Sequence, residues 1–573
     1  MDSPMGRRWQ VYAAAGERGI RLAEELHLSP FLVQLLINRG LSTPETILEY
    51  LNPSLDQLRS PFEIPDMDKA VARLLLARER HEKVVVFGDY DVDGVTGSAQ
   101  LLTALRLLGI DSRAYLPDRY SEGYGLNRDA IDQFARDGVA VVITVDCGVS
   151  NADEIRALKA HGLDVLITDH HTLPDPLPPA DAVVHPKRIP GPHPSKHLSG
   201  AGVAFKVAWG LLEKAGAATP ENIEKLIDLA AIGTIGDVVP LLGENRVLTA
   251  AGLKVIQKME RPGLRSLLHF TRTKKKVGVR EVGFQICPRL NAAGRLEHAS
   301  QGLDLLMAED AMTAQSMARD LENLNRKRRT LGDSALQEAE VLLQGGVEDA
   351  ADRKFLLVSG EGWHIGVIGI IAARLAEKYY RPAILVSSHN GVCRGSARSI
   401  DGFDVHELLA TCSDLFVAFG GHRAAAGFEI LPENISKLRE RLTVAMDTRA
   451  PYVDFIPKIK IDAVLAPSQL HVGLAMELEA MAPFGLGNPE PLFMLPQVTV
   501  EGARTVASGA HLKLKCRING ARFEAMGFRQ GALADSFMHP QQVDLACHIE
   551  RDSWNGADSL LVKLADVRFP VIK

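Results

Sequence analysis

The chain has 573 residues, 46% of them hydrophobic and 24% charged, with a formal net charge of −6 and a pI near 6.3. This composition indicates a large soluble enzyme with about three to four domains, and it excludes a chain that binds nucleic acid through its overall charge. The six cysteines form no CxxC pair and no zinc-ligand spacing, so they exclude a cysteine zinc module and predict reduced cytosolic thiols.

The first sixty residues are predicted to form helices. The apolar segment LVQLLINRG at 32–40 is followed by a Ser-Thr-Pro-Glu helix start at 42–45. The N-terminal residues MDSPMGRRWQ lack the apolar region of a signal peptide, and no uncharged apolar stretch reaches membrane-spanning length. We therefore expect a cytoplasmic protein that does not enter a membrane.

Four polar motifs follow short apolar runs: GDYDVDG at 88–94, VDCG at 145–148, DHH at 169–171 and IGDVVP at 235–240. Each is predicted to lie just beyond the carboxyl end of a buried strand, where open α/β sheets place their sites. The strand-like runs VVVF at 84–87, VVITV at 141–145 and VLIT at 165–168 alternate with helical patterns. This alternation predicts a doubly wound parallel sheet.

The side chains of these motifs are expected to converge in one crevice: Asp89, Asp91, Asp93, Asp146, Asp169, His170, His171 and Asp237. Like charges so close together are costly in a partly desolvated site, and a pair of divalent cations removes that cost. Oxygen ligands with one or two imidazoles suit Mn²⁺ or Mg²⁺ better than a closed zinc site. Two metals about 3.5–4 Å apart are suited to phosphodiester hydrolysis. The alternative, that these aspartates are helix caps and turn residues, suits each one singly better than it suits four motifs together.

A basic stretch follows the four motifs. Residues 254–295 hold eleven lysines or arginines against only Glu260 and Glu281, with TRTKKKVGVR at 271–280 as the centre. The stretch is either a solvated charged face or a wall that tracks phosphates beside the metal site.

The remainder of the chain predicts a connecting helix and two further domains. Met317, Leu321, Leu324, Leu331, Ala335 and Leu342 recur at helical spacing and predict one buried face of a long helix between two lobes. Residues 351–450 restart an α/β pattern, with the strand-like runs FLLVS and AILVS on either side of a helical segment. After residue 451, short alternating segments such as VTVEGARTV and HLKLKCRI are typical of a small β-barrel.

The ordered motifs resemble those of the DHH phosphoesterase superfamily and, within it, the RecJ family of bacterial single-strand-specific 5′→3′ DNA exonucleases. Further matching segments are LPDRYSEGYGLN at 116–127, PRLNAAGRL at 288–296, GWHIGVIGIIAARLAEKYYRP at 362–382, RGSARS at 394–399 and GGHRAAAGF at 420–428. One departure is Phe87, where many relatives carry a histidine that could ligate metal; Asp89 could take its place.

The resemblance implies an α/β fold in which a DHH doubly wound domain and a DHHA1 domain are joined by a long helix and followed by an OB-fold. The domains expected from it are an N-terminal helical extension at 1–60, the DHH domain at 61–300, the connecting helix at 301–350, the DHHA1 domain at 351–450 and the OB-fold at 451–573.

We use the resemblance to assign roles to the clustered residues. One Mn²⁺ or Mg²⁺ ion is expected on Asp89, Asp91 and Asp146, and a second on Asp93, Asp146, His170 and Asp237, with Asp146 as the bridge. Asp169 and His171 are the expected catalytic pair. Asp169 would orient an imidazole, and His171 would face the scissile phosphate.

Substrate-binding residues are expected in both lobes: Arg119, Tyr124, Arg289, Arg295, Arg394, Ser396, Arg398, Gly420, Gly421 and His422. Arg394, Ser396 and Arg398 are expected in a loop that receives a terminal phosphate, with Arg119 and Tyr124 opposite. In the OB-fold, residues that could bind a single strand are Phe523, Phe528, Trp554, Lys513, Lys515, Arg517 and Arg529.

The favoured function is a processive exonuclease that releases 5′-mononucleotides from single-stranded DNA, in DNA recombination and repair. The expected partners are single-stranded DNA, a single-strand binding protein and a helicase, and the enzyme is expected to be a monomer. A phosphodiesterase of oligoribonucleotides or cyclic dinucleotides, a pyrophosphatase and a non-catalytic DNA-binding scaffold are the alternatives. The C-terminal β domain and the basic stretch argue against small substrates, and the retained metal ligands argue against the scaffold.

Overall fold

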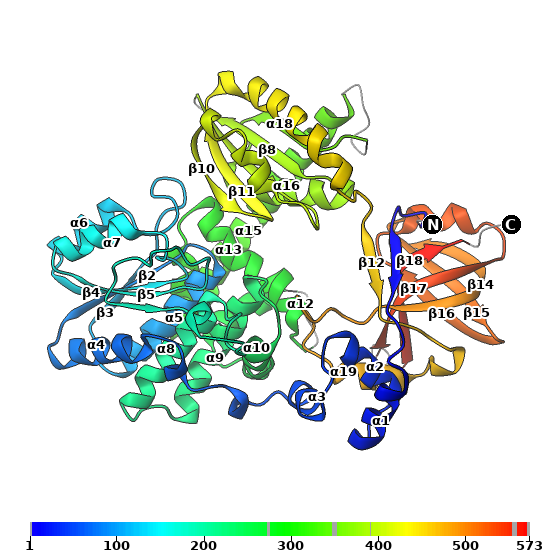
Figure 1. Ribbon diagram of the computed structural model, residues 1–573, viewed down its shortest axis with the longest axis horizontal. Coiled ribbons are helices and arrows are strands. Elements are labelled where there is room, and N and C mark those ends of the chain that lie inside the picture. The colour runs from blue at the N-terminus through cyan, green and yellow to red at the C-terminus, as the bar shows by residue number, and fades with distance from the viewer. Residues whose placement is uncertain (1–2, 272–275, 346–351, 390, 553–558, 570–573) are drawn as a thin grey trace. The chain divides into compact units, whose positions relative to one another are not determined.

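The computed structural model describes residues 3–271, 276–345, 352–389, 391–552 and 559–569, and its ribbon is drawn in Figure 1. The chain divides into two compact units. The larger comprises mainly Trp9–Glu322 and Lys460–Lys573, and the smaller comprises mainly Asn323–Ile459. Each unit is described by itself.

The larger unit contains a five-stranded parallel sheet with the strand order β3-β2-β4-β5-β6. Its strands are β2 (Lys83–Gly88), β3 (Ser112–Tyr115), β4 (Val139–Val145), β5 (Asp164–Thr168) and β6 (Ala182–Val184). The central strands read as continuous valine and isoleucine runs because helices cover both faces of the sheet. The predicted doubly wound parallel sheet is confirmed.

Two sets of helices cover this sheet. Three helices connect successive strands: α5 (Val92–Leu107), α6 (Arg128–Arg136) and α7 (Ala152–Ala160). Helix α4 (Met67–Glu79) precedes β2, and α8 (Gly200–Lys214) follows β6. Phe87, Phe134 and Ile155 belong to one buried cluster between the sheet and helices α6 and α7. On the other face, α5 packs against α8 and against α9 (Pro220–Gly236).

The segment before Asp237 is helical, which corrects one prediction. The apolar run LIDLAAIGTIG forms the buried second half of α9, and Asp237 is the residue that ends this helix. A short apolar run looks the same in a buried helix as in a buried strand, so the strand prediction failed here. Asp237 therefore reaches the site from a helix end, whereas the other motifs follow strands β2, β4 and β5.

A run of helices continues the larger unit: α10 (Gly243–Ile256), α11 (Pro262–His269), α12 (Val279–Glu281), the π-helical turn η4 (Val282–Ile286), α13 (Cys287–Leu296) and α14 (Ser300–Met307). The long helix α15 (Ala311–Gln344) follows, and the division between the two units falls within it, so the predicted connecting helix is confirmed. Leu321 and Ala335 are buried as predicted, but Leu342 is exposed and Leu343 is buried in its place.

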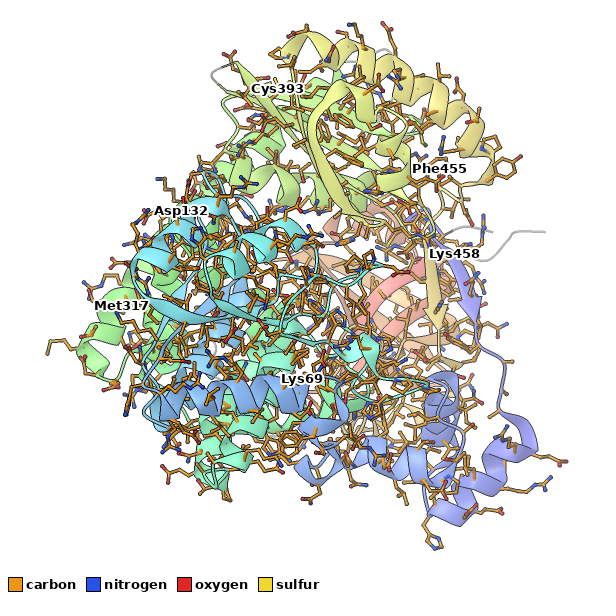
Figure 2. All side chains as sticks on the ribbon, turned by 60° about the vertical axis from the view of Figure 1, so that its left-hand side comes forward. Lys69, Asp132, Met317, Cys393, Phe455 and Lys458 are labelled. Atoms are coloured by element: carbon orange, nitrogen blue, oxygen red, sulfur yellow. The ribbon has the colours of Figure 1, made fainter. Side chains whose placement is uncertain are left out.

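The smaller unit has a five-stranded mixed sheet with the order β10-β11-β9-β8-β7. Its elements are β7 (Leu356–Glu361), α16 (Ile365–Tyr379), β8 (Ala383–His389), β9 (Val392–Arg398), α17 (Val405–Ala410), β10 (Phe416–His422), β11 (Ala425–Ile430) and α18 (Ile435–Arg449). Phe455 and Lys458 lie on the segment by which the chain leaves this unit (Figure 2). The guanidinium carbon of Arg381 is 4.4 Å from the centre of the Phe455 ring, and Lys458 pairs with Asp454 at 2.8 Å. The α/β pattern predicted for this region is confirmed.

The C-terminal part of the larger unit is a closed five-stranded barrel, as predicted. Strands β14 (Phe493–Val506), β15 (His511–Ile518), β16 (Ala521–Gly527), β18 (Ser559–Arg568) and β17 (Gln541–Asp552) pair in this order, and β17 returns to β14. The barrel core includes residues from the N-terminal helices α1 (Gly16–Leu26), α2 (Pro30–Asn38) and α3 (Pro44–Leu51), and from α19 (Val472–Glu479).

A buried arginine ties the barrel to the helices of the parallel-sheet domain. Arg246 of α10 lies 3.7 Å over the Tyr50 ring and donates to the carbonyls of Tyr50, Ala482 and Pro483. The neighbouring Leu241 donates its backbone N–H to the Leu486 carbonyl at 2.8 Å. Leu241 lies four residues after Asp237, so the barrel supports the segment that follows this aspartate.

Within the described part of the chain, none of the helices is both long enough and apolar enough to span a bilayer.

Candidate metal centre and substrate-binding residues

The first aspartate motif forms the turn between β2 and α5. Asp91 is the N-cap of α5, and its Oδ1 accepts the backbone N–H of Asp93 at 2.8 Å and of Gly94 at 3.3 Å. A Cβ on Gly94 would lie 2.4 Å from the Asp89 carbonyl oxygen, so only glycine allows so tight a turn. The turn places Asp89, Asp91 and Asp93 within five residues at the carboxyl end of β2.

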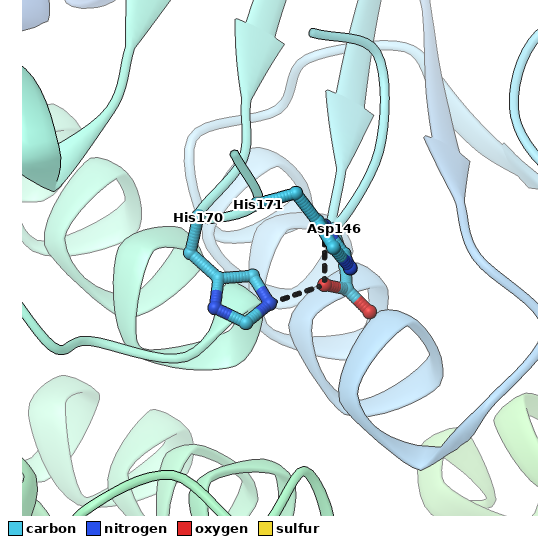
Figure 3. A group of neighbouring side chains, drawn as sticks. All are labelled: Asp146, His170 and His171. Atoms are coloured by element: carbon cyan, nitrogen blue, oxygen red, sulfur yellow. Dashed lines mark ion pairs between the residues drawn. The ribbon is translucent and has the colours of Figure 1, made fainter. Parts of the chain in front are cut away.

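Asp146 occupies the same edge of the sheet, directly after β4. Its backbone has a left-handed φ of 63° and donates its N–H to the Thr168 carbonyl of β5 at 3.0 Å. Both imidazoles of the DHH motif face one oxygen of this carboxylate (Figure 3). His170 Nε2 lies 3.1 Å and His171 Nδ1 lies 3.9 Å from Asp146 Oδ1.

Asp237 completes the cluster from the end of α9. His170 Nε2 lies 3.6 Å from Asp237 Oδ2 and 3.9 Å from Asp93 Oδ2. The cluster contains three groups of residues that could each hold a metal ion, and within each group the potential ligand atoms lie within 4.8 Å of one another. The groups are Asp89–Asp91–Asp146, Asp93–His170–Asp237 and Asp146–His170–His171. The structure thus brings together the residues expected to hold two cations, with Asp146 shared between groups.

Four buried polar atoms of this cluster have no hydrogen-bond partner among the residues that the structure describes: Asp89 Oδ1, Asp146 Oδ1, His170 Nε2 and Asp237 Oδ2. Burial and the charge of neighbouring carboxylates raise the pKa of Asp93 to about 7 and of Asp237 to about 9. The same causes raise the pKa values of Asp89 and Asp146 well above their usual range. Unpaired buried acceptors that repel one another are what divalent cations stabilise, so this donor set fits Mn²⁺ or Mg²⁺.

His170 is suited to ligate a metal as a neutral imidazole. Burial, followed by the charge of His171, lowers the pKa of His170 to about 3. A neutral imidazole has a free lone pair, which a metal ligand requires.

Backbone amides at the start of α8 hold Asp93 in place. Its two carboxylate oxygens accept the N–H groups of Gly200 at 2.6 Å and Ala201 at 2.9 Å. The positive end of the α8 dipole lies at the same point and favours a carboxylate. A Cβ on Gly200 would lie 2.6 Å from the Asp146 side chain, and one on Gly233 would lie 2.7 Å from Asp93 Oδ1. Sequence reasoning missed these residues, although Ser199 followed by Gly-Ala-Gly before an apolar run was a visible helix start.

Asp169 orients the imidazole of His171. Asp169 is fully buried and accepts four hydrogen bonds. One comes from His171 Nδ1 at 2.8 Å, and three come from the backbone N–H groups of His170 at 2.7 Å, His171 at 3.1 Å and Val149 at 3.1 Å. Burial alone would raise the pKa of Asp169, but the hydrogen bond and charge of His171 hold it at about 2. Burial lowers the pKa of His171, yet Asp169 outweighs burial and raises it. The ionised Asp169 carboxylate therefore favours the protonated form of the His171 imidazole.

Two residues outside the predicted set support His171 from the loop after β6. His185 Nε2 lies 2.9 Å from the His171 carbonyl oxygen, and Lys187 Nζ donates to the same oxygen at 3.1 Å. Tyr124 lies on the other side, 3.1 Å from the Asp146 carbonyl oxygen and 3.3 Å from His171 Nδ1. Tyr124 thus lies beside the potential metal ligands, and its role in substrate binding stays a prediction.

Arg119 also lies close to the first motif. Its guanidinium carbon is 4.2 Å from the centre of the Tyr90 ring, and its charge counteracts the rise in the pKa of Asp89. On the far side of the turn, Asn291 Oδ1 accepts the Val92 N–H at 2.8 Å, and a Cβ on Gly294 would lie 2.4 Å from the Tyr90 carbonyl oxygen. The segment PRLNAAGRL therefore buttresses the aspartate turn, a role that its sequence did not reveal.

Phe87 stands where a metal-ligating histidine was considered. Its ring is fully buried and stacks on Tyr115 with centroids 5.4 Å apart, and it meets the edge of Phe134 at 6.4 Å. The side chain therefore belongs to the core, and the cluster of potential ligands is assembled from other residues.

Arg289 corrects one substrate-binding prediction. It is 4% exposed, and its Nε pairs with Glu322 at 2.7 Å while Nη1 donates to the Gln285 carbonyl at 2.6 Å. A buried, ion-paired guanidinium supports the fold and is not presented to a ligand. Arg295 is half-buried, and its carbonyl accepts the Tyr120 hydroxyl.

The predicted phosphate-binding residues of the smaller unit lie on strands, whereas a loop was expected for the first set. Arg394, Ser396 and Arg398 belong to β9, and Gly420-Gly421-His422 ends β10. The register through β11 aligns Ser396 with Gly420 and Arg398 with His422. Ser396 and Gly420 therefore lie in one row across the sheet, and Arg398 and His422 lie in another, with β11 between the two strands.

Contacts within this unit distinguish the residues further. Arg398 donates to Ser396 Oγ at 3.1 Å, and Arg394 pairs with Glu429 at 3.4 Å. A Cβ on Gly421 would lie 2.5 Å from the Ala425 carbonyl oxygen, so this glycine serves the pairing of β10 with β11. A Cβ on Gly420 would meet nothing within 4 Å, so its backbone is open to a ligand.

Two predicted features lie outside the described residues. These are residues 272–275 of the basic stretch and Trp554 of the barrel. Within the described part, Arg261 pairs with Asp228 at 2.7 Å, and Lys258 pairs with Glu224 at 2.7 Å. In the barrel, Lys513 and Arg517 pair with Glu524 and Glu501. Lys515 and Arg529 are exposed, Phe523 is half-buried and Phe528 is 46% exposed.

Comparison with protein-family models matches all three folded domains. The model described as "DHH family, N-terminal domain" matches residues 83–234, "DHHA1 domain" matches 352–447 and "RecJ OB domain" matches 461–566.

Several characterised proteins are similar over most of the chain. The single-stranded-DNA-specific exonuclease RecJ of Bacillus subtilis is 36% identical over 567 residues, which cover 98% of this chain and 71% of that protein. The protein of the same name from Escherichia coli is 33% identical, with 94% of this chain and 96% of that protein covered.

Solved structures agree with these relatives. The crystal structure of RecJ in complex with Mn²⁺ from Thermus thermophilus has a TM-score of 0.85 at 32% identity and covers 98% of this chain and 80% of that chain. A crystal structure of exonuclease RecJ bound to manganese has a TM-score of 0.61 at 35% identity, with 70% and 98% covered.

Proposed function

Because the chain belongs to the RecJ family of DHH nucleases, we propose that it hydrolyses single-stranded DNA processively from the 5′ end and releases 5′-mononucleotides. The chain is a metal-dependent exonuclease, as its relatives are. The direction of digestion and the product are the finer parts of the proposal. It acts in DNA recombination and repair.

The observation that carries this proposal is the cluster of eight polar side chains at one edge of the parallel sheet. Asp89, Asp91 and Asp146 would hold one divalent cation, and Asp93, His170 and Asp237 would hold a second beside Asp146. The retained ligands and their unpaired buried oxygens distinguish the chain from a scaffold that only binds DNA. When bound, Mn²⁺ or Mg²⁺ supplies an activated water and neutralises charge on the phosphate.

The residues of the chain itself perform three tasks around that centre. The amides of Gly200 and Ala201 fix Asp93, and the Thr168 carbonyl fixes the backbone of Asp146. Asp169 holds the ring of His171 and favours its protonated form, which offers a positive charge to a phosphate oxygen. Tyr124 and Arg119 add a hydroxyl and a guanidinium beside the ligands for positioning the strand.

The smaller unit supplies the proposed recognition of the DNA end. Arg398 and Ser396 form one polar group on β9 that suits a terminal phosphate, because a guanidinium forms two charge-assisted hydrogen bonds with phosphate oxygens. Gly420 leaves its backbone open, and His422 follows two residues later on the same strand. We assign the 5′ end of the strand to this group.

The barrel is the proposed path for the following nucleotides. OB-folds bind single strands by stacking bases on aromatic side chains over a basic groove, for which Phe528 and Lys515 are candidates. Single-stranded DNA is the substrate. A single-strand binding protein and a helicase are the proposed partners, and the proposed state is a cytoplasmic monomer.

Digestion of end-labelled substrates tests the proposal. Single-stranded DNA, duplex DNA and RNA of one sequence would be incubated with Mn²⁺, Mg²⁺ or EDTA. We expect mononucleotides from the 5′ end of single-stranded DNA with either metal and no products with EDTA. Release from the 3′ end first, or equal digestion of the duplex, would contradict it.

A further inference from the structure

One side chain near the metal centre has no role in the site described above. Phe284 is 77% exposed, and the only other exposed phenylalanine in the described part of the chain is Phe528, at 46%. Burying a phenyl ring is worth roughly 1.5–3 kcal/mol, so a phenylalanine that the fold leaves in water forgoes that stabilisation.

The local fold holds Phe284 outward. It lies in the middle of the π-helical turn η4, whose flanking residues Val282 and Ile286 are fully buried. Gly283 faces Ile235 of α9, where a Cβ would lie 3.6 Å from the isoleucine side chain. Cys287 is three residues after Phe284, and its thiol lies 3.7 Å from the Ile232 carbonyl oxygen. Because its neighbours are anchored, the turn cannot rotate the phenyl ring into the core, and such π-turns occur frequently at functional sites.

The same helix leads to the metal ligands. Asn291 accepts the backbone N–H of Val92, the residue between Asp91 and Asp93. Phe284 is seven residues before Asn291, a distance of about 10 Å along a helix, or about three stacked nucleotides. On its inner side η4 packs against α9, which ends at Asp237.

Two exposed cations precede this ring in the chain. Arg280, four residues earlier on the same side of the helix, is exposed, and so is Lys276. An exposed aromatic ring beside exposed cations suits an unpaired nucleobase with its backbone phosphate, because bases stack on rings while phosphates contact the cations. A purely apolar partner would leave those charges unused.

We infer that Phe284 is a stacking platform for one base of the DNA single strand next to the metal centre, with Arg280 contacting the adjoining phosphate. This inference rests on the proposed function and adds a subsite to it. Duplex bases already stack on their neighbours on both faces, so a platform of this kind also favours an unpaired strand.

A cycle of protein and DNA changes tests the inference. Binding would be measured by fluorescence anisotropy in EDTA, so that the strand is not cleaved. A series of 5′-phosphorylated oligonucleotides would each lack one base among the first eight nucleotides. The proteins would be wild type, Phe284→Ala, Phe284→Leu, Phe284→Trp and, as a control exposed aromatic, Tyr452→Ala, whose side chain belongs to a residue 91% exposed.

We expect one position, or two neighbouring ones, at which loss of the base weakens wild-type binding by about 5- to 150-fold. Phe284→Ala and Phe284→Leu should weaken binding to the intact strand by a similar factor and show no further loss at that position. Phe284→Trp and Tyr452→Ala should behave as wild type.

Two results would overturn the inference: wild-type affinity of Phe284→Ala for the intact strand, or an unchanged penalty for the missing base in that variant. Both leave the proposed function intact if wild type still digests single-stranded DNA. If wild type neither binds nor digests the strand, the proposed function fails as well. Phe284 is exposed, so thermal unfolding of its variants should match wild type and confirm that they are folded.

Discussion

The replacement Asp169→Asn tests how the carboxylate behind His171 contributes to catalysis. Asp169 accepts four hydrogen bonds, and only one amide oxygen of asparagine can accept them. If that oxygen takes the Oδ1 position, the amide NH₂ group faces the N–H of Val149, and two donors oppose each other. The His171 imidazolium also loses its anionic partner.

The size of the effect follows from these contacts. A hydrogen bond to a charged group contributes about 1.5–3 kcal/mol and one between neutral groups about 0.5–1.5 kcal/mol. Losing the Val149 bond and weakening the other three should lower the free energy of unfolding by about 4.5–7.5 kcal/mol. Residues that orient a ligand or catalytic group typically change activity 10- to 100-fold, so we expect kcat to fall within that range.

The assay is kcat on a short 5′-phosphorylated oligonucleotide at saturating Mn²⁺, below the unfolding temperature of the variant. The matched control is Asp228→Asn, another buried acid, which lies in the middle of α9 and binds Arg261 at 2.7 and 3.0 Å. It should lose stability while keeping wild-type kcat. Wild-type turnover in Asp169→Asn, or an equal loss of turnover in Asp228→Asn, would refute the reasoning.

Three further predictions follow from the site and the units around it. Asp93→Ala and Asp146→Ala should each lose nearly all turnover. Both variants should bind DNA within about threefold of wild type, because phosphate contacts elsewhere supply most of the affinity. Digestion within tenfold of wild type by either variant in a gel assay would contradict the ligand assignment. Arg398→Ala should reduce the preference for a 5′-phosphate over a 5′-hydroxyl by about ten- to hundredfold in matched rate measurements, the value of one charge-assisted hydrogen bond; an unchanged preference would remove Arg398 from the end-binding group. Truncation after residue 452 should slow digestion of long strands more than of very short ones. It should also lower the melting temperature, because it removes the carbonyls of Ala482 and Pro483 to which Arg246 donates. Equal losses on both substrates would mean that the barrel has only a structural role.

The sequence predicted the clustering of these side chains because their positions follow from a simple rule. Asp91, Asp146 and His170 come directly after valine- and isoleucine-rich strands, and parallel strands end at the same edge of a sheet. Asp237 was placed in the right cluster for a partly wrong reason, because the apolar run before it is a buried helix. A run of that length carries no periodicity that separates the two structures.

Other features of the site lack a signature in the residues themselves. The donors that hold Asp93 are backbone amides, and these could belong to any residue at the start of α8. Arg289 was expected to bind substrate because the segment PRLNAAGRL resembles its counterpart in the family. Its actual partner, Glu322, lies 33 residues away, and only the fold brings the two together. The exposure of Phe284 was equally invisible, since an isolated phenylalanine is normally read as core.

The most direct test of the two-cation centre is the number of Mn²⁺ ions that the protein binds, measured by calorimetric titration together with nuclease activity. Wild type should bind two ions per chain and reach full activity only when both are bound. Asp146→Ala, which removes the shared carboxylate, should bind fewer ions and lose activity with them. Full activity with a single bound ion, or unchanged Mn²⁺ binding in Asp146→Ala, would contradict the account.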